Sequence, residues 1–394
     1  MKLAILTSGF KPVPAIKGGA VEQLVTDIVE ANEKFHKYDI DLYTLYDKKL
    51  SIYKNRYKYT HIIMVRDPQK NIFLRIKHSL YRRLFNSQKR VNYVSERMAR
   101  SFKRNYYDKV LVENNMDTYD AVYKLKSKEK FYFHLHNDFD NGDAEKTKKK
   151  TLHIINTATK LLVVSNYLKE RLKLYGAKNI EVVYNFVDDS KFKQLNRNDE
   201  AKLREYYGVK KEDTVFTYIG RLDKEKGVDK LLEALTYLND RNDIKCFVVG
   251  NSFFSSAEEK KYNNKLHSIF KNVNDKVTFT GYIDNSDLYK IYALSDCIVI
   301  PTQVEEAFGM VALEAMRMKK PVIASNSGAL PEILSPQGSI IFEKKDIHAL
   351  SEAIRRIASD KKIREKMGEK NYIAGDRFPH NIYEYFSLVA KALS

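Results

Sequence analysis

The sequence is poor in cysteine and has no long apolar run, and each shortage excludes a class of protein. Only Cys246 and Cys297 occur, each inside a strand-like apolar segment, which predicts reduced core thiols and excludes a disulfide framework. No apolar run approaches the roughly 20 residues that a membrane-spanning helix needs. Ser8 and Gly9 end the opening run MKLAILTSGF, so we interpret it as the first buried strand of a cytoplasmic protein rather than as a signal peptide.

The composition is that of a globular chain with two domains. The 394 residues are too many for one simple core, and 43% of them are hydrophobic and 30% charged. No internal repeat or low-complexity segment is present. The two halves therefore share an architecture rather than a sequence.

Short apolar runs alternate with helical patterns along the whole chain, which predicts doubly wound α/β domains. The strand-like runs of the first half are KLAIL, IDLYTL, THIIMV, KVLVEN, KFYFHLH, KLLVVS and IEVVYN, and those of the second half are TVFTYIG, IKCFVVG, KVTFTG, DCIVI and PVIAS. The polar stretch 188–212 separates the two series. We therefore expect one domain over 1–187 and a second over 188–377, with a final amphipathic helix within 378–394 that packs back on the first.

The net charge of +18 is concentrated in one segment. Residues 70–104 hold eleven Lys or Arg and a single acid, Glu96. Within this segment, NIFLRIKHSLYRRLF places apolar side chains at helical spacing with basic residues between them. Such a helix is suited to an anionic membrane surface, which is the interpretation we favour; the alternative is a solvated helix packed by its apolar stripe on its own domain. Nucleic acid would also fit the charge, but no zinc-finger or RNP-type motif is present.

The segment YIGRLDKEKGVDKLLEAL, residues 218–235, predicts a phosphate site. A buried strand ends at Ile219, Gly220 turns the chain, and a helix begins after Lys224. Arg221 and Lys226 then flank a helix N-terminus, and two cations beside a helix dipole suit a diphosphate.

The segment EEAFGMVALEAM, residues 305–316, contains a carboxylate that needs a partner. A helix that begins near Gly309 carries Glu314 only about 7 to 8 Å along its axis, with Glu306 in the loop before it. Its first-turn amides, at Gly309, Met310 and Val311, face the same place. A nucleotide sugar satisfies all of these groups, with Glu314 on the ribose and Glu306 on the sugar; the alternative for Glu314 alone is a buried salt bridge with a basic residue.

These motifs resemble those of a known family. Glu306 and Glu314, followed by KKPVIASNSGALPEIL, are similar to the E-x7-E signature of retaining GT-B glycosyltransferases, specifically glycosyltransferase family 4. GRLDKEKGVDKLLEAL resembles the family's phosphate-binding segment, and FTGYI, with Tyr282 and Ile283, resembles its nucleobase loop. The resemblance is specific over residues 180–375 and looser before them.

Two N-terminal features agree with this resemblance. The loop FKPVPAIKGGAVEQLV places Gly18 and Gly19 before a helix, and in the family this loop closes over the donor. At the end of the strand FHLHND, His136 matches the family's active-site histidine. We expect His134 to point to the opposite face and into packing.

Two segments depart from the family or imitate another. The family has a glycine after the asparagine that follows the last N-domain strand, whereas this chain has Phe186 after Asn185, so the turn there must differ. Asp138 and Asp140 imitate the metal-binding D-x-D motif of the other glycosyltransferase fold, which we interpret as a coincidence.

The resemblance implies a metal-independent transfer with retention of anomeric configuration and no cofactor. His136, Glu306, Arg221 and Lys226 are the expected catalytic residues. The expected donor-binding residues are Gly18, Gly19, Gly220, Arg221, Lys226, Tyr282, Ile283, Glu306, Phe308, Gly309, Met310, Val311 and Glu314. The leading hypothesis for the acceptor is a lipid-linked glycan at the inner face of a bacterial membrane, in capsule, exopolysaccharide or cell-wall synthesis.

Two other functions remain as alternatives. A basic nucleic-acid-binding protein on a degenerate α/β scaffold accounts for the charge but leaves Glu306 and Glu314 without a purpose. A phosphorylase or sugar-nucleotide epimerase of related fold needs either a phosphate or cofactor site, or turnover without an acceptor. The base, the sugar and the linkage are not identified by the sequence.

Overall fold

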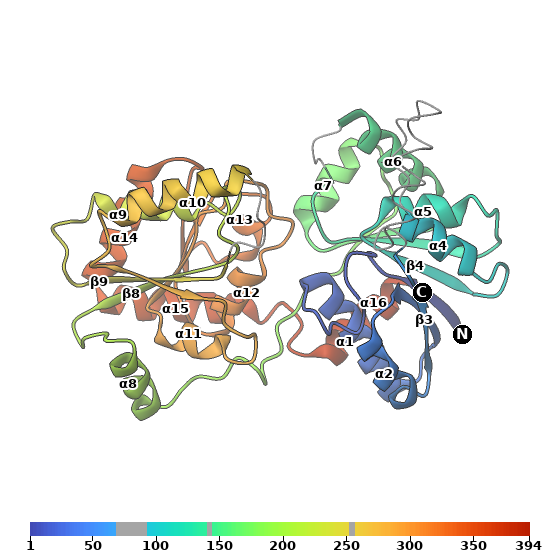
Figure 1. Ribbon diagram of the computed structural model, residues 1–394, viewed down its shortest axis with the longest axis horizontal. Helices are drawn as coiled ribbons and strands as arrows, with labels where there is room; N and C mark the ends of the chain where they lie inside the picture. Colours follow the sequence, from blue (N-terminus) through green and yellow to red (C-terminus); the bar gives the residue numbers. More distant parts are fainter. Residues whose placement is uncertain (68–92, 140–143, 252–256) are drawn as a thin grey trace. The chain divides into compact units, whose positions relative to one another are not determined.

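The computed structural model describes residues 1–67, 93–139, 144–251 and 257–394, and these divide into two compact units (Figure 1). Unit 1 comprises Met1–Tyr184 and Ile382–Ser394, and unit 2 comprises Asn185–Asn381. The chain therefore passes into unit 2 once and returns to unit 1 for its last helix. The two junctions expected from the sequence, 187/188 and 377/378, lie within four residues of these boundaries.

Unit 1 is built around a seven-stranded parallel sheet. Its strands are β1 (Lys2–Leu6), β2 (Asp39–Leu45), β3 (Thr60–Val65), β4 (Lys109–Glu113), β5 (Lys130–Leu135), β6 (Lys160–Val163) and β7 (Ile180–Val182). They lie in the order β3-β2-β1-β4-β5-β6-β7. Nearly every residue of β4 and β5 is buried, as is usual for a parallel sheet covered on both faces.

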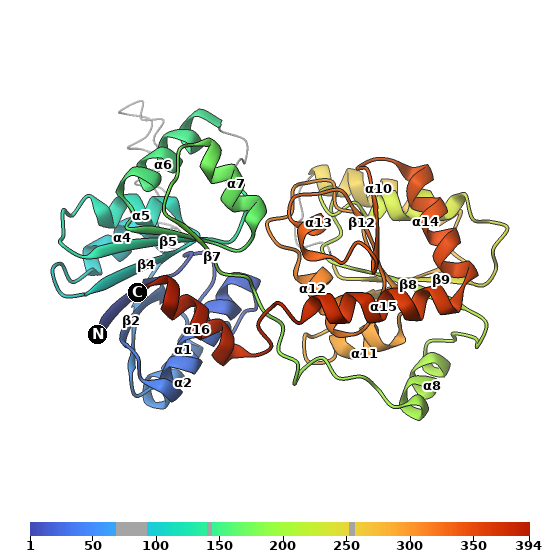
Figure 2. The same cartoon turned by 180° about the vertical axis from the view of Figure 1, so that it is seen from behind.

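Helices cover both faces of this sheet (Figures 1 and 2). They are α1 (Ala20–Phe35), the 3₁₀ turn η1 (Lys48–Leu50), α2 (Ser51–Arg56), α4 (Tyr93–Ser101), α5 (Met116–Tyr123), α6 (Ala144–Thr157), α7 (Asn166–Leu174) and α16 (Ile382–Ala392). The C-terminal helix α16 packs against α1 and buries Tyr385, Phe386 and Val389. An apolar stripe at helical spacing thus ties the end of the chain to the first domain.

Unit 2 repeats the plan with six parallel strands, β8 (Thr214–Ile219), β9 (Ile244–Val249), β10 (Val277–Gly281), β11 (Cys297–Ile300), β12 (Val322–Ser325) and β13 (Ser339–Phe342). Their order is β10-β9-β8-β11-β12-β13. The helices are α8 (Arg197–Tyr206), α9 (Val228–Thr236), α10 (Ala257–Phe270), α11 (Leu288–Leu294), α12 (Met310–Arg317), α13 (Leu330–Ile333), α14 (Ile347–Ser359) and α15 (Lys361–Gly375).

The predicted fold class, two doubly wound α/β domains, is confirmed. All seven strands expected in the first half are present, and five of the six in unit 2 were expected. Strand β13 was missed because it has only four residues, of which two are not fully buried, and follows the turn-forming segment SPQG. Both cysteines are buried and unpaired.

The strand orders locate the two places where ligands bind in folds of this kind. The order reverses between β1 and β4 in unit 1 and between β8 and β11 in unit 2. Crevices open at such switch points, beyond the carboxyl ends of the strands. The loops that follow β1, β4, β8 and β11 therefore carry the candidate site residues.

Candidate functional site

In unit 2 the loops after β8 and β11 lie against each other. The amide of Gln303 donates to the carbonyl of Glu225 over 2.7 Å, and the hydroxyl of Thr302 donates to the same oxygen over 3.1 Å. Gly227, the N-cap of α9, has a φ of 70°, and a Cβ there would lie 2.0 Å from the carbonyl oxygen of Pro301. Only glycine permits so close an approach of the two loops.

This approach brings Lys226 and Glu306 together from positions 80 residues apart in the sequence. The ammonium of Lys226 contacts the carboxylate of Glu306 in an ion pair whose two side chains stay partly open to solvent. The guanidinium of Arg221 lies 2.9 Å from Asp223 and 3.3 Å from Glu225, in its own loop. The phosphate-site cations predicted from the sequence are therefore partnered by carboxylates in this structure.

Helix α12 starts beside this ion pair. Its N-cap is Gly309, with a φ of 100°, where a Cβ would lie 2.6 Å from Leu330. The amides of Met310 and Val311 belong to the first turn, whose N–H groups have no acceptor within the helix. A glycine-capped helix start next to a lysine suits an anionic group.

Glu314, one turn further along α12, has a tyrosine as its protein partner. The hydroxyl of Tyr292 in α11 donates to Oε2 of Glu314 over 2.5 Å. Among the described residues no Lys, Arg or His forms an ion pair with Glu314, so the salt bridge with a basic residue that the sequence left open is wrong there. Burial raises the pKa of Glu314 to about 7, although the hydrogen bond from Tyr292 acts in the opposite direction.

Glu305, which precedes Glu306 in the sequence, has partners other than Lys226. Its carboxylate accepts from the amide of Gly328 over 2.5 Å and contacts the ammonium of Lys344. The backbone carbonyl of Glu306, in turn, accepts from the amide of Ala329 over 2.8 Å. The two adjacent glutamates are thus separated, and only Glu306 is directed to Lys226.

The strand ends beside β8 form a glycine-lined surface. Gly250 donates to the carbonyl of Gly281 over 2.9 Å, and a Cβ on Gly250 would lie 1.9 Å from the carbonyl oxygen of Gly220. Tyr282, directly after β10, is 60% exposed, and Ile283 is partly buried. Gly220 and Tyr282 were expected at the site, but Gly250 was not. Its distinguishing feature is a φ of 137°, which the sequence does not reveal.

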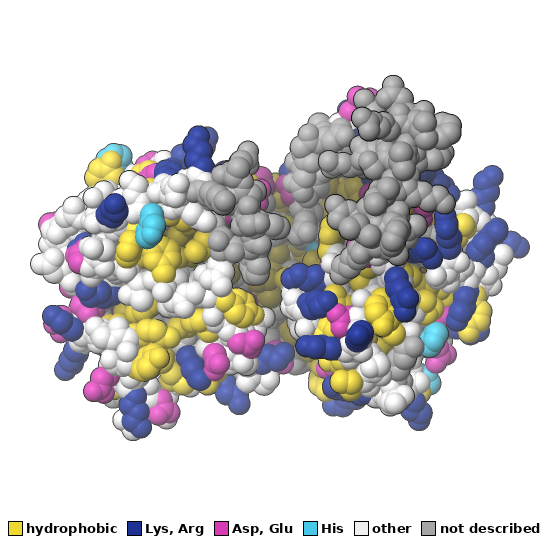
Figure 3. All heavy atoms as spheres, viewed as in Figure 1, with side chains coloured by type: hydrophobic (Ala, Val, Ile, Leu, Met, Phe, Trp, Pro, Cys, Tyr) yellow, Lys and Arg dark blue, Asp and Glu magenta, His cyan; other side chains and the backbone are white. Residues whose placement is uncertain are grey.

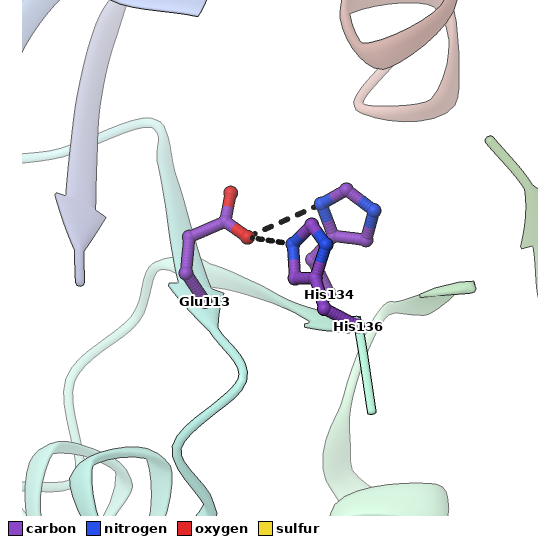
Figure 4. Close-up of side chains that lie close together, drawn as sticks. All are labelled: Glu113, His134 and His136. Carbon is purple, nitrogen blue, oxygen red and sulfur yellow. Dashed lines mark hydrogen bonds and ion pairs between the residues drawn. The ribbon is translucent and has the colours of Figure 1, made fainter. Parts of the chain in front are cut away.

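In unit 1 His136 lies at the end of β5 in a buried cluster with Glu113 and His134 (Figure 4). Glu113 Oε2 is 2.7 Å from Nε2 of His136 and 3.2 Å from Nδ1 of His134. The expectation that His134 faces the other way is wrong, because residues two apart in a strand share a face. Strand register also pairs Glu113 with His134 across β4 and β5.

The charges within this cluster are strongly perturbed. Burial alone would raise the pKa of Glu113, but the two histidines lower it to about 2. Burial and the neighbouring His134 lower the pKa of His136 to about 4, against the opposing effect of Glu113. Among the described residues these three side chains are also the group whose ligand atoms are close enough to hold a metal ion.

The loop after β1 holds Gly18 and Gly19 in left-handed backbone conformations, with φ values of 63° and 114°. Gly19 is the N-cap of α1, and a Cβ there would collide with the carboxylate of Glu22. Glu22 is buried and accepts a hydrogen bond of 2.7 Å from the hydroxyl of Ser8. The first turn of α1 therefore carries a carboxylate of its own.

The structure describes Phe186, which departs from the family pattern, and Asp138, which belongs to the D-x-D imitation. Phe186 is buried and does not have a positive φ, so its turn avoids the strain that a glycine position would impose. Asp138 contacts Arg171 and accepts a 3.1 Å hydrogen bond from Tyr167. Asp140 lies outside the described residues.

Most of the basic segment at 70–104 also lies outside the described residues, including the amphipathic stretch 71–85. Its described end, α4, packs against α5, where Ser95 and Thr118 share a 2.8 Å hydrogen bond. Lys and Arg side chains are spread over the face of unit 1 seen in Figure 3. Among the described residues, no helix combines the length and the apolar character needed to cross a bilayer.

The chain has two doubly wound domains, and the second carries Lys226, Glu306 and Glu314 at its switch point. This combination defines a glycosyltransferase of the GT-B fold. Family models agree: that of the glycosyl transferases of group 1 matches residues 199–373, and that of Glycosyltransferase Family 4 matches residues 61–191. Together they cover more than half of the chain. The protein belongs to the family 4 glycosyltransferases.

Individual relatives have diverse roles. The chain is 29% identical over 269 residues to the lipopolysaccharide 1,2-N-acetylglucosaminetransferase of Salmonella typhimurium, covering 66% of each protein. It is 28% identical over 220 residues to the capsular polysaccharide biosynthesis glycosyltransferase CapM of Staphylococcus aureus, covering 54% of this chain and 55% of that one. The crystal structure of Anabaena HepE with UDP superposes with a TM-score of 0.78 at 18% identity, covering 100% of this chain and 99% of that one. The matched regions span about two thirds of the Salmonella protein and about half of the Staphylococcus protein.

Proposed function

We propose that this protein transfers a sugar from a nucleotide-sugar donor to a glycan acceptor in the synthesis of a bacterial surface polysaccharide. The observation that carries the proposal is the meeting of Lys226, Glu306 and the glycine-capped start of α12, with Glu314 one turn further along. Cations and amides suit the diphosphate, and carboxylates suit the hydroxyls of ribose and sugar. The names of the Salmonella and Staphylococcus relatives support a lipopolysaccharide-like or capsular product.

The proposed transfer breaks the bond between the anomeric carbon and the diphosphate and forms one to an acceptor hydroxyl. Lys226, Arg221 and the first-turn amides of α12 stabilise the negative charge that develops on the leaving diphosphate. The acceptor proton passes to the leaving phosphate, and the anomeric configuration is retained. Glu306 orients the sugar, and His136 is the further catalytic residue that the family resemblance implies. No metal ion takes part in this scheme.

Arg221 and Lys226 are bound to carboxylates of the protein, so a donor diphosphate must compete with these carboxylates for the two cations. A diphosphate that reaches Lys226 competes with Glu306 for the ammonium. A sugar hydroxyl can then donate to the released carboxylate, so one exchange of partners prepares both ends of the donor. This exchange links recognition of the diphosphate to recognition of the sugar.

The proposed acceptor is a lipid-linked glycan at the inner face of the cell membrane. The support is the basic amphipathic segment within residues 70–104. Liposomes with and without anionic lipid provide the test, because replacing the basic residues of this segment by glutamine should abolish binding to the anionic vesicles. Unchanged binding would remove the membrane from the proposal and leave the donor site unaffected.

The decisive experiment is a thermal-shift panel of nucleoside diphosphates and nucleotide sugars, with and without EDTA. A ligand at 100 times its Kd stabilises the fold by about 2.7 kcal/mol. We expect one nucleotide class to stabilise the protein with or without EDTA. The Glu314→Ala variant should lose binding of every nucleotide, whereas Glu306→Gln should lose only the additional contribution of the sugar.

Glu305→Gln is the matched control, because Glu305 is adjacent in sequence but bound to Gly328 and Lys344. It should keep the wild-type response to sugars. If no nucleotide stabilises the wild type, or if the Glu305 and Glu306 variants respond alike, the proposed donor site is wrong.

A further inference from the structure

Arg317, the last residue of α12, is a buried guanidinium that the proposed chemistry does not use. It is 4% exposed and lies one turn beyond Glu314. Its Nη2 donates to the carbonyl of Phe378 over 2.9 Å and to that of Pro379 over 3.3 Å. Its Nε lies 3.1 Å from Oδ1 of Asp189. Burial of a guanidinium is costly in free energy unless an opposite charge and hydrogen bonds compensate for the lost water, and these partners supply both.

The partners of Arg317 belong to the two chain segments that connect the units. Asp189 follows the passage into unit 2 after Tyr184, and residues 378–380 precede the return to unit 1 at Ile382. The two segments are also bound to each other: the amide of Asp189 donates to the carbonyl of His380 over 3.1 Å, and Nδ1 of His380 lies 2.8 Å from Oδ2 of Asp189. Arg317 therefore fastens both connectors to α12.

The opposite end of α12 is attached to the same connector. The ring of Phe308, directly before Gly309, packs edge-on against the ring of Phe378, with 5.8 Å between centroids and 87° between planes. Phe378 thus contacts the start of α12 through its side chain and the end of α12 through its carbonyl. Because α12 has only eight residues, about 12 Å, a single residue of the returning connector can contact both of its ends.

We propose that Arg317, with Phe308 and Phe378, couples occupation of the donor site to the chain segments that join the two units. This inference rests on the proposed function of the site at Glu306, Gly309 and Glu314. A nucleotide that binds the first turn of α12 restricts the motion of that helix. The hydrogen bonds of the forked guanidinium of Arg317 transmit this restriction to residues 185–190 and 376–381. Arg317 is in this sense a positioning residue, because it contacts neither the proposed donor nor the proposed acceptor.

The geometry suits arginine in particular. A planar guanidinium reaches two carbonyls and the carboxylate of Asp189 at once, and Oδ1 of Asp376 lies 3.8 Å from its Nη1. Lysine at this position keeps the charge but cannot keep all three contacts. Arg317→Lys and Arg317→Met therefore separate the effect of charge from that of the fork.

Hydrogen exchange with and without nucleotide tests this coupling. UDP, GDP, ADP and dTDP are first compared by calorimetry, and the tightest binder is the probe. We expect it to slow exchange at least about fivefold in residues 185–190 and 376–381 of the wild type. In Arg317→Lys and Arg317→Met this slowing should disappear while the Kd changes by less than about threefold.

Arg355→Met is the matched control, since Arg355 forms a surface pair with Asp240, with contacts of 2.6 and 3.0 Å. It should keep the wild-type exchange response. Asp189→Asn, at a half-exposed position, gives a second way to break the link if the Arg317 variants fail to fold.

Two results would overturn the inference: nucleotide binding to the wild type without slower exchange in the connectors, or the same slowing in the Arg317 and Asp189 variants. Absence of nucleotide binding to the wild type would instead refute the proposed function itself, and the inference with it.

Discussion

The carboxylate clusters of the two units differ in how much of their surface they leave open. In unit 1, Glu113 has no exposed surface and lies against two imidazoles. In unit 2, Lys226 and Glu306 keep 28% and 16% of their side chains exposed. The first lies at the carboxyl ends of β4 and β5, and the second lies in the loops that follow β8 and β11. The first is arranged to hold its own side chains in place, and the second can exchange its internal partner for a ligand.

Strand register explains the difference. Glu113 and His134 are paired across adjacent strands, so their contact is fixed by the sheet itself. Lys226 and Glu306 come from two loops that meet across the switch point between β8 and β11. Side chains on loops are less constrained than side chains on paired strands, so a ligand can displace one from the other at lower cost. Four pairs of variants or conditions test this contrast.

The largest effect is expected for Glu113→Ala. The substitution leaves two buried imidazoles without their common carboxylate, and breaking such a pair typically costs about 3–5 kcal/mol. Urea denaturation measures this loss of unfolding free energy. Glu129→Ala is the control, since Glu129 is also buried but accepts from the backbone amide of Tyr106, and should cost about 1–3 kcal/mol. Equal losses for the two variants would contradict a special role for the cluster.

The second comparison concerns Lys226 and Arg221. Lys226→Met should lower kcat/KM for the nucleotide sugar about 100- to 1,000-fold, as removal of one charge-stabilising donor does in other enzymes. Arg221→Met should lower it less than about tenfold, because Arg221 is 41% exposed and already lies against Asp223 and Glu225. Steady-state release of the nucleoside diphosphate provides the measurement. A larger loss for Arg221 would reverse the proposed order of the two cations.

The third comparison is the response of unit 1 to acid. The pKa of His136 is about 4 in the folded protein, below the ordinary histidine value of 6.5, so the unfolded chain binds a proton first. Stability should fall as the pH decreases from 6.5 to 4, by up to about 3 kcal/mol. The pKa of Glu113, lowered to about 2, adds a further loss below pH 4.5.

Denaturation at pH 7, 5.5 and 4 measures this loss. The variant His136→Gln should remove the fall in stability that His136 causes above pH 4.5 and leave the opposite contribution of Glu314, whereas His348→Gln, at an exposed position on α14, should retain both. An unchanged slope in the His136 variant would show that other groups cause the acid sensitivity.

The fourth comparison is the response of unit 2 to base. The pKa of Glu314 is raised from 4.5 to about 7, so its burial is tolerated best when it is protonated. Stability should therefore fall as the pH rises from 4.5 through 7, by up to about 3 kcal/mol. Glu314→Gln should be more stable than the wild type at pH 8 and similar to it at pH 4.5.

Thermal unfolding at the two pH values provides the test, and Glu352→Gln on the exposed side of α14 is the control. The gain in stability should be accompanied by loss of nucleotide binding, because an amide is a weaker acceptor for ribose hydroxyls than a carboxylate. A variant that gains no stability at pH 8 would contradict the raised pKa.

Much of the fold could be predicted because strands and helices follow from local hydrophobic patterns. Apolar runs of four to seven residues separated by helical segments identified twelve of the thirteen strands. The amphipathic pattern of the last residues identified α16. Strand β13 was lost because a four-residue edge strand has too short a pattern to stand out.

The site was predicted less completely because its partners lie far apart in the chain. Glu306 and Lys226 were both named, but not as an ion pair. Tyr292 was missed as the partner of Glu314, since a buried tyrosine in a short helix looks like any core residue. His134 was assigned to the wrong face although the two-residue period of a strand already contradicts that assignment.

The sequence by itself determined the class of fold, the family and the identity of the polar residues at the strand ends, because period and motif are local properties. Tertiary structure alone decided which of these residues meet. The approach of Gly227 to Pro301 joins Lys226 to Glu306, and the return of the chain along α12 brings Phe378 to both Phe308 and Arg317. Contacts of this kind depend on how separate elements pack, and no local pattern encodes that.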